Sequence, residues 1–251
     1  MYPATESRRR RSDIADLLIF VHIPKTAGTT LREIVSRQYN REEVFTAGIN
    51  EPWHDSVARL RMLPAADKQR LRVAQGHFGF GLHESFPQAS TYMTILRDPV
   101  ERAISFYTYV RQDPESRFQR FGRDWPTLRE FVSDRLADEL DNGQVRQLTR
   151  LNLGEGTVSD ECLEHAKRNL DSHFSVVGVS ERFDDSLRLC QHVFGWESVD
   201  YVSRRITANR PPKRALDQDT LRAINQANRL DVQLYAHAEK MLDTSLREVR
   251  S

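Results

Sequence analysis

The fold of this 251-residue chain is decided by residues 17–30, LLIFVHIPKTAGTT. The stretch opens with a nearly continuous apolar run, which is typical of a strand buried on both faces of a parallel sheet. The run ends at Pro24, and from Thr30 onward apolar residues recur on one face of an amphipathic helix, with charged residues on the other. The pattern therefore predicts a strand, a phosphate-type loop and a helix in succession.

The same logic recurs further along the chain. A second apolar strand is predicted at residues 91–96, where it runs into Arg97-Asp98-Pro99 and a helix that continues to residue 110. Strands separated by helices predict an α/β protein: a three-layer fold with a central parallel sheet flanked by helices. The remaining predicted elements are strands at 174–179 and, more weakly, 72–75, and helices within 126–170, 185–193 and 217–246.

Length and composition are those of an ordinary globular protein. We expect a basic, disordered N-terminal tail at residues 1–13, followed by a single domain at 14–251, because this length is near the upper limit for one hydrophobic core. The formal net charge of +1 gives no indication of a nucleic-acid or membrane partner. No apolar run reaches the roughly 20 residues of a membrane span, so we expect a cytoplasmic protein with no integral membrane segment. Cys162 and Cys190 lack metal or redox spacing and are expected to be reduced and structural.

Residues 24–30, PKTAGTT, offer what an oxyanion site needs. They combine a lysine, small residues that let backbone N–H groups approach a ligand, hydroxyls, and the start of a helix. This is not a Walker A loop, because the lysine precedes the glycine. A helix-capping turn is the alternative, since threonine is an ordinary N-cap residue.

Arg97 stands at the end of the second predicted strand, and Ser105 follows about two turns along the next helix. Ligands of open parallel sheets bind beyond the carboxyl ends of the strands, so both strand ends are expected to line one crevice. Alternatively, Arg97 forms a surface ion pair with Asp98 or Glu101.

Two segments resemble motifs of a known enzyme family. Residues 20–31, FVHIPKTAGTTL, resemble the 5′-phosphosulfate loop of carbohydrate sulfotransferases related to heparan sulfate 2-O-sulfotransferase. Residues 95–107, ILRDPVERAISFY, resemble the 3′-phosphate motif of the same family. The resemblance implies a P-loop-like fold, with 3′-phosphoadenosine 5′-phosphosulfate (PAPS) as sulfuryl donor, adenosine 3′,5′-bisphosphate (PAP) as product, and no metal.

The resemblance also implies which residues bind the donor. Arg97 and Ser105 would hold the 3′-phosphate. Residues 205–212, RITANRPP, are similar to the late loop that closes over the nucleotide, with Thr207 and Arg210 as candidates; an ordinary connection stopped by proline is the alternative. The 5′-phosphosulfate would be held by Lys25, Thr26, Ala27, Gly28, Thr29 and Thr30.

His77, in residues 75–81, QGHFGFG, is the candidate general base. A neutral imidazole can take the proton from an acceptor hydroxyl, and the flanking glycines leave room for a substrate. The 2-O-sulfotransferases carry a His-Gly-His arrangement at this point, whereas this chain has Gln75 at the first position, which leaves a single histidine. The alternative is a satisfied, partly buried histidine. We expect His22, on the first strand, to be a packing residue.

The resulting hypothesis is an in-line sulfuryl transfer to a hydroxyl of a glycan or glycolipid acceptor. Lys25 would stabilise the charge on the departing phosphate, and His77 would activate the hydroxyl. Two alternatives stay open: a non-catalytic protein that binds PAP or sulfated glycans, and a divergent nucleotide-dependent kinase. The sequence gives no indication of oligomeric state.

Overall fold

A computed structural model describes residues 16–48, 52–149, 156–202 and 210–250. Its centre is a five-stranded sheet with strand order β2-β3-β1-β4-β5, in which all neighbouring strands pair in parallel. The predicted α/β fold with a central parallel sheet is therefore confirmed. The strands are β1 (Leu17–Val21), β2 (Val44–Ala47), β3 (Val73–Gly76), β4 (Ser90–Leu96) and β5 (Phe174–Val179).

Strand β1 lies in the middle of the sheet because its side chains are apolar on both faces. All five of its residues are buried, and the strand pairs with β3 on one side and β4 on the other. The four predicted strands are present in the structure. The edge strand β2 was not predicted, because three of its four residues are only half-buried and they form no continuous apolar run.

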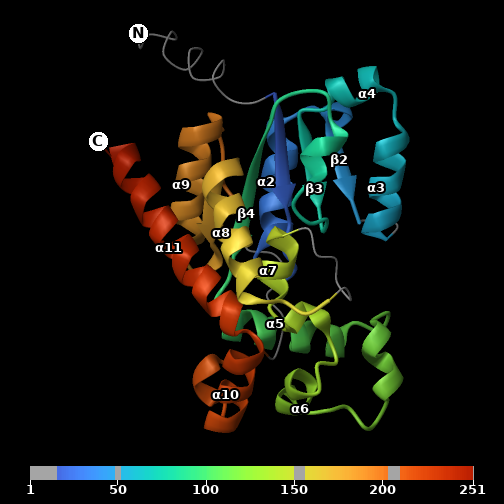
Figure 1. Ribbon diagram of the computed structural model, residues 1–251, viewed down its shortest axis with the longest axis vertical. Helices are drawn as coiled ribbons and strands as arrows, with labels where there is room; N and C mark the ends of the chain where they lie inside the picture. The colour runs from blue at the N-terminus through green and yellow to red at the C-terminus, as the bar shows by residue number, and fades with distance from the viewer. Residues whose placement is uncertain (1–15, 49–51, 150–155, 203–209, 251) are drawn as a thin grey trace.

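Helices pack on the sheet and beyond the end where its strands finish. Figure 1 shows α5 and α7 at that end, with α6 and α10 further out and the long α11 along one side. The chain there builds a second, smaller apolar cluster from α5, α6 and α10, separate from the main core around the sheet. The helices are α2 (Gly28–Gln38), α3 (Trp53–Met62), α4 (Ala65–Arg70), α5 (Pro99–Gln112), α6 (Leu128–Ser133), α7 (Gly143–Leu148), α8 (Asp160–His173), α9 (Phe183–Phe194), α10 (Gln218–Ala227) and α11 (Arg229–Arg250).

The start of α5 is fixed by its sequence. Pro99 is the first helical residue, as predicted, and the Asp98 carboxylate accepts a hydrogen bond of 2.9 Å from the Glu101 N–H. This cap orients the helix so that Arg97 lies at the junction between β4 and α5.

The two cysteines agree with the role that the sequence predicts for them. Both cysteines are free thiols, and Cys190 is buried, as its predicted structural role requires. Among the residues that the structure describes, no helix is both long enough and apolar enough to cross a bilayer. The predicted tail at residues 1–13 lies outside the described residues.

Candidate active site

The loop between β1 and α2 has an unusual backbone. Lys25 and Ala27 have φ angles of 70° and 65°, in the left-handed region that residues with a Cβ seldom adopt. The Thr26 hydroxyl donates to the Ile23 carbonyl at 2.9 Å, and no side chain of the described residues caps the N-terminus of α2. The capping-turn alternative is therefore wrong, and the first N–H groups of α2 are left to meet an anion.

His22 explains why residue 28 is glycine. A Cβ built on Gly28 would lie 1.9 Å from Cδ2 of the His22 ring, so the imidazole packs directly on the first turn of α2. The His22 side chain is buried and stacks on Phe20. These contacts agree with its predicted packing role, and its buried Nδ1 has no hydrogen-bond partner among the described residues.

Arg97, between β4 and α5, and Arg102, in the first turns of α5, hold two carbonyl groups of this loop. Arg97 Nη1 donates to the Lys25 carbonyl at 3.0 Å, and Arg102 Nε donates to the Pro24 carbonyl at 3.1 Å. Two strand ends that are more than 70 residues apart in sequence therefore meet in one place, as the strand-end argument predicted. Because the arginines take the carbonyl oxygens, the loop can turn its N–H groups toward a ligand.

Arg97 and Arg210 form a cationic pair beside the loop. Burial lowers the pKa of both guanidinium groups, and the charge of Arg97 lowers that of Arg210 further. The Nε atom of each is buried and has no hydrogen-bond partner among the described residues. Two partly dehydrated guanidinium groups with unused donors suit a doubly charged phosphate monoester.

Two carboxylates face this pair. Glu101 forms ion pairs with Arg210 and, at 3.8 Å, with Arg97. Glu181 lies 3.6 Å from Arg97 Nε and accepts a hydrogen bond from the Tyr235 hydroxyl at 2.9 Å. The predicted alternative pairing of Arg97 with Glu101 is thus present in this structure.

Ser105 lies on the face of α5 that looks toward the loop. Arg102, Ser105 and Tyr109 are spaced three and four residues apart, which places them on one side of the helix. Arg102 holds the Pro24 carbonyl, and the Lys25 ammonium lies 4.0 Å from the centre of the Tyr109 ring. Ser105, between them along the helix, is buried. Thr207, the remaining predicted donor residue, lies outside the described residues.

His77 comes directly after β3, and its ring packs against His22 with 4.3 Å between centroids. Its Nδ1 lies 2.9 Å from the His22 carbonyl oxygen. A carbonyl only accepts, so Nδ1 carries the proton and Nε2 keeps its lone pair. Burial lowers the pKa of His77 below 6.5, opposed by the hydrogen bond to His22 and helped by the charge of Arg32. The imidazole is therefore neutral near pH 7 and can accept a proton at Nε2.

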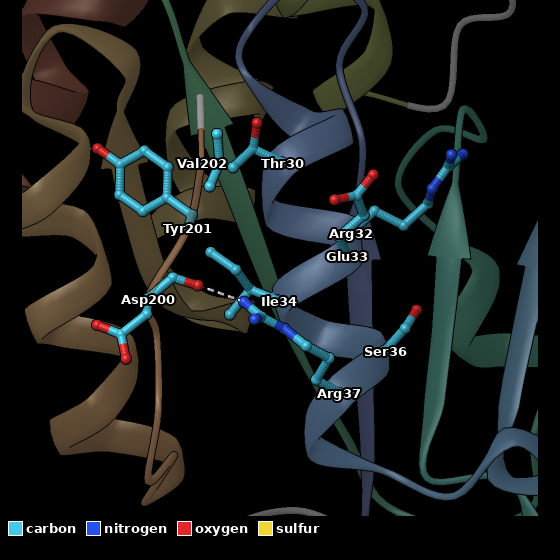
Figure 2. Close-up of a pocket in the computed structure, with 9 residues that line it drawn as sticks. All are labelled: Thr30, Arg32, Glu33, Ile34, Ser36, Arg37, Asp200, Tyr201 and Val202. Carbon is cyan, nitrogen blue, oxygen red and sulfur yellow. Dashed lines mark hydrogen bonds between the residues drawn. The ribbon is translucent and has the colours of Figure 1, made fainter. Parts of the chain in front are cut away.

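A pocket of about 580 Å³ adjoins the loop. Figure 2 shows it between α2 and residues 200–202, with Thr30 toward one end and the Arg37 guanidinium bonded to the Asp200 carbonyl toward the other. Because Thr30 belongs both to the phosphate-type loop and to the pocket lining, the pocket continues the loop along α2.

Several residues around this site were not predicted. Glu181 follows β5 as Arg97 follows β4, so the strand-end rule used for Arg97 would also have indicated it. Arg102 lies inside the motif at residues 95–107. Gln144 and Gln147 of α7, which contact the backbone of Arg97 and His77, had no local signal.

Comparison with known proteins gives consistent results. The chain is 26% identical to human heparan-sulfate 6-O-sulfotransferase 1 over 90% of its own length and 65% of that protein. It is 26% identical to bovine galactose-3-O-sulfotransferase 3, over 87% of this chain and 55% of the relative, and 26% identical to mouse galactosylceramide sulfotransferase, over 88% and 55%. It thus spans less than two thirds of the length of these curated relatives.

A solved structure and a family model were also matched. The crystal structure of mouse sulfotransferase SULT7A1 complexed with PAP aligns with a TM-score of 0.44 and 14% identity, over 89% of this chain and 70% of that one. The family model described as galactose-3-O-sulfotransferase matches residues 1–250, which is almost the whole chain. The chain therefore belongs to the galactose-3-O-sulfotransferase family of carbohydrate sulfotransferases.

Proposed function

We propose that this protein transfers a sulfuryl group from PAPS to a hydroxyl group of a carbohydrate, by in-line displacement with His77 as the general base. The observation that carries the proposal is the convergence of three motifs on one short segment. Arg97 donates to the Lys25 carbonyl, and His77 donates to the carbonyl of His22, three residues earlier in the chain. The base must deprotonate the hydroxyl that attacks the sulfur of the bound donor, so the donor site and the base have to be neighbours, and these two contacts support that placement.

The residues present fit the donor nucleotide. The N-terminus of α2, which lacks a side-chain cap, and the residues from Lys25 to Thr30 suit the 5′-phosphosulfate. Arg97 and Arg210, whose buried Nε atoms have no hydrogen-bond partner among the described residues, suit the 3′-phosphate together with Ser105. The pocket beside Thr30 would take the adenosine, and Thr207 remains part of the proposal through the family resemblance.

The side chains then have separate tasks. PAPS supplies the sulfuryl group when it is bound. His77 Nε2 accepts the proton of the acceptor hydroxyl, and the Lys25 ammonium stabilises negative charge on the departing phosphate. Lys25 now lies on the Tyr109 ring, a contact worth about 0.5–1 kcal/mol at an exposed site. A charge-assisted hydrogen bond to phosphate is stronger, so the contact with Tyr109 does not prevent the Lys25 ammonium from binding the phosphate.

The acceptor is proposed from the relatives. Their names specify 6-O sulfation of heparan sulfate, 3-O sulfation of galactose, and sulfation of galactosylceramide. What these share is a sugar hydroxyl, so we propose a glycan or glycolipid acceptor. None of these three relatives is named as a 2-O-sulfotransferase, and we do not extend the motif resemblance to that position.

Isothermal titration with PAP, ADP and adenosine 5′-phosphate tests the donor site, and sulfate transfer from labelled PAPS to a panel of glycans tests the activity. We expect PAP to bind much more tightly than the other two nucleotides, and the preference to be lost in Arg97→Ala. Preference for ADP with magnesium would contradict the proposal and favour a kinase. PAP binding without transfer to any glycan would favour a binding protein.

A further inference from the structure

Helix α7 contacts two of the three motifs through glutamine side chains. Gln144 and Gln147 are three residues apart and so lie on the same side of this short helix. Both use their amide groups on backbone atoms of the site. The two glutamines bond to different parts of the site, and we therefore predict a different role for each.

Gln147 contacts the residues around the base. Its Nε2 lies 3.1 Å from the carbonyl oxygens of both His22 and His77, and 3.2 Å from that of Phe78. An amide nitrogen has two hydrogens, so the three oxygens share them. The backbone carbonyl of Gln147 also accepts a 2.9 Å bond from the Phe80 N–H. One side chain thus ties the end of β1 to the segment that carries His77.

The His22 carbonyl is the shared element of this arrangement. It accepts from His77 Nδ1 at 2.9 Å and from Gln147 Nε2 at 3.1 Å. The oxygen that fixes the tautomer of His77 is therefore itself fixed by Gln147. If the Gln147 amide were removed, the His22 carbonyl would keep its bond from His77 Nδ1 and lose the one from Gln147. The backbone carbonyl of His77 would also lose its bond from Gln147.

Gln144 clamps the backbone of Arg97. Its Oε1 accepts from the Arg97 N–H at 3.0 Å, while its Nε2 donates to the Arg97 carbonyl at 3.0 Å. This two-point clamp needs a donor and an acceptor on one planar group, which a primary amide provides. It holds the peptide from which the Arg97 side chain reaches the Lys25 carbonyl.

The helix that carries both glutamines is itself anchored in the core. The Asp231 carboxylate accepts from the N–H groups of Gln144 and Val145 at 3.1 and 2.9 Å. Asp231 is fully buried and pairs with Arg102 at 3.9 Å, and Arg102 holds the Pro24 carbonyl. Helix α7 is thus fixed relative to the loop on which the site is built.

We propose that α7 supplies two independent positioning residues for sulfuryl transfer: Gln147 aligns the base His77, and Gln144 aligns the nucleotide-binding Arg97. The inference rests on the proposed function and goes further, because it assigns separate tasks to two residues that act through others. Substitution of Gln147 should impair turnover, and substitution of Gln144 should impair nucleotide binding.

The experiment compares Gln147→Met and Gln144→Met, which remove the amide and keep a side chain of similar length. For Gln147→Met we expect turnover at saturating PAPS to fall about 10- to 100-fold, because small misplacements of catalytic groups have effects of this size. The Kd for PAP should change less than about twofold. For Gln144→Met we expect the Kd for PAP to rise about tenfold or more, with a smaller change in turnover at saturating PAPS.

A pH profile separates positioning from general stability. Without Gln147, the His22 carbonyl becomes a better acceptor for His77 Nδ1, and this bond favours the protonated imidazole, which raises the pKa of His77. The acidic limb of the rate profile should therefore move to higher pH in Gln147→Met. Arg32 and His22, the other groups that face His77, are unchanged by the substitution.

Gln119→Met is the matched control. Gln119 Nε2, on the 3₁₀ turn Arg117–Phe121, also bridges three backbone carbonyls, those of Val110, Arg111 and Asp113, none of which is assigned to donor binding or catalysis. It should lower the thermal unfolding midpoint and leave both the Kd for PAP and the turnover near wild type. If either methionine variant fails to fold, Gln147→Leu or Gln144→Leu replaces it, since leucine also lacks the amide and places no charge against the backbone carbonyls.

The outcomes are distinguishable. Parallel losses of turnover and PAP affinity in both glutamine variants would overturn the inference, as would effects on the unfolding midpoint alone. Failure of the wild-type protein to bind PAP would instead refute the proposed function, and with it the positioning role of α7. An unchanged pH profile in Gln147→Met would contradict the inference that Gln147 acts through His77.

Discussion

The Nδ1 atom of His77 lies 2.9 Å from the backbone carbonyl oxygen of His22, which fixes the proton on that nitrogen and leaves Nε2 as the free base. The partner is a main-chain atom, so no substitution of a neighbouring side chain removes it. The base therefore takes its tautomer from the geometry of the sheet, whereas many catalytic histidines take theirs from an acidic side chain.

His77→Ala should abolish most of the activity. We expect turnover to fall about 10²- to 10⁴-fold, the usual range for a lost general base. PAP binding, measured by titration, should stay near wild type because His77 is proposed to act on the acceptor. His237→Ala, which alters a histidine paired with Asp171 on α8, is the control and should retain activity. Normal turnover in the His77 variant would disprove the assignment of the base.

The rate should depend on pH through His77. The imidazole must be neutral to accept a proton, and burial lowers its pKa below 6.5. We therefore expect kcat/KM to fall as the pH is lowered through a midpoint below the ordinary histidine pKa, and to lack this acidic limb in His77→Ala. A midpoint well above 6.5 would mean that another group controls the reaction.

Arg97→Ala should weaken PAP binding. Hydrogen bonds to charged groups contribute about 1.5–3 kcal/mol, which corresponds to a rise in Kd of roughly 10- to 150-fold. Arg188→Ala is the control, because Arg188 is an exposed arginine that pairs with Asp185 on the same helix α9. If both variants lost affinity equally, general loss of positive charge rather than a specific phosphate contact would be responsible.

Gly28→Ala should disrupt the loop, because the added Cβ would overlap the His22 ring. We expect a lower unfolding midpoint and weaker PAP binding, since either the imidazole or the first turn of α2 must move. The double variant Gly28→Ala/His22→Ala removes the clash and should recover part of the loss in binding. No recovery in the double variant would show that the two residues do not compete for this space.

Asp231→Ala should be among the most destabilising single substitutions in this chain. It leaves the buried Arg102 without its ion-pair partner and removes the cap of α7, so we expect the free energy of unfolding in urea to fall by about 3–5 kcal/mol. Asp160→Ala is the matched control: its carboxylate pairs with Arg229 at the surface, where solvent screens the pair and its loss should change the free energy of unfolding little. Equal effects would contradict the special role of the buried pair.

Much of the sheet could be predicted from the sequence because its central strands are continuous apolar runs. The predicted bounds of the last strand, 174–179, agree with β5, and those of the second differ from β4 by one residue. Within residues 126–170, where helices are predicted, the dipeptide Asn142-Gly143 is typical of a break between helices. In the structure Asn142, with φ of 49°, directly precedes α7, and its side-chain oxygen accepts from the N–H groups of Leu230 and Asp231. Those partners are distant in sequence, so no local pattern indicates them.

In the site, too, features with a local sequence pattern could be predicted and long-range contacts could not. Strand ends predicted that Lys25 and Arg97 would meet, and the structure places them in contact. Gln144 and Gln147 could not be predicted, since a glutamine that binds backbone carbonyls has no recognisable spacing. The roles of the donor and catalytic residues, the domain bounds and the cytoplasmic location stay predictions.

The cap that Asp231 provides for α7 also bears on how the protein is made. The two bonded partners are separated by 86 and 87 residues of chain. During synthesis the phosphate-type loop therefore leaves the ribosome well before Asp231, whose carboxylate completes the support for Arg97. Contacts of such long range form slowly, so the loop is made long before the support that holds Arg97 beside it is complete.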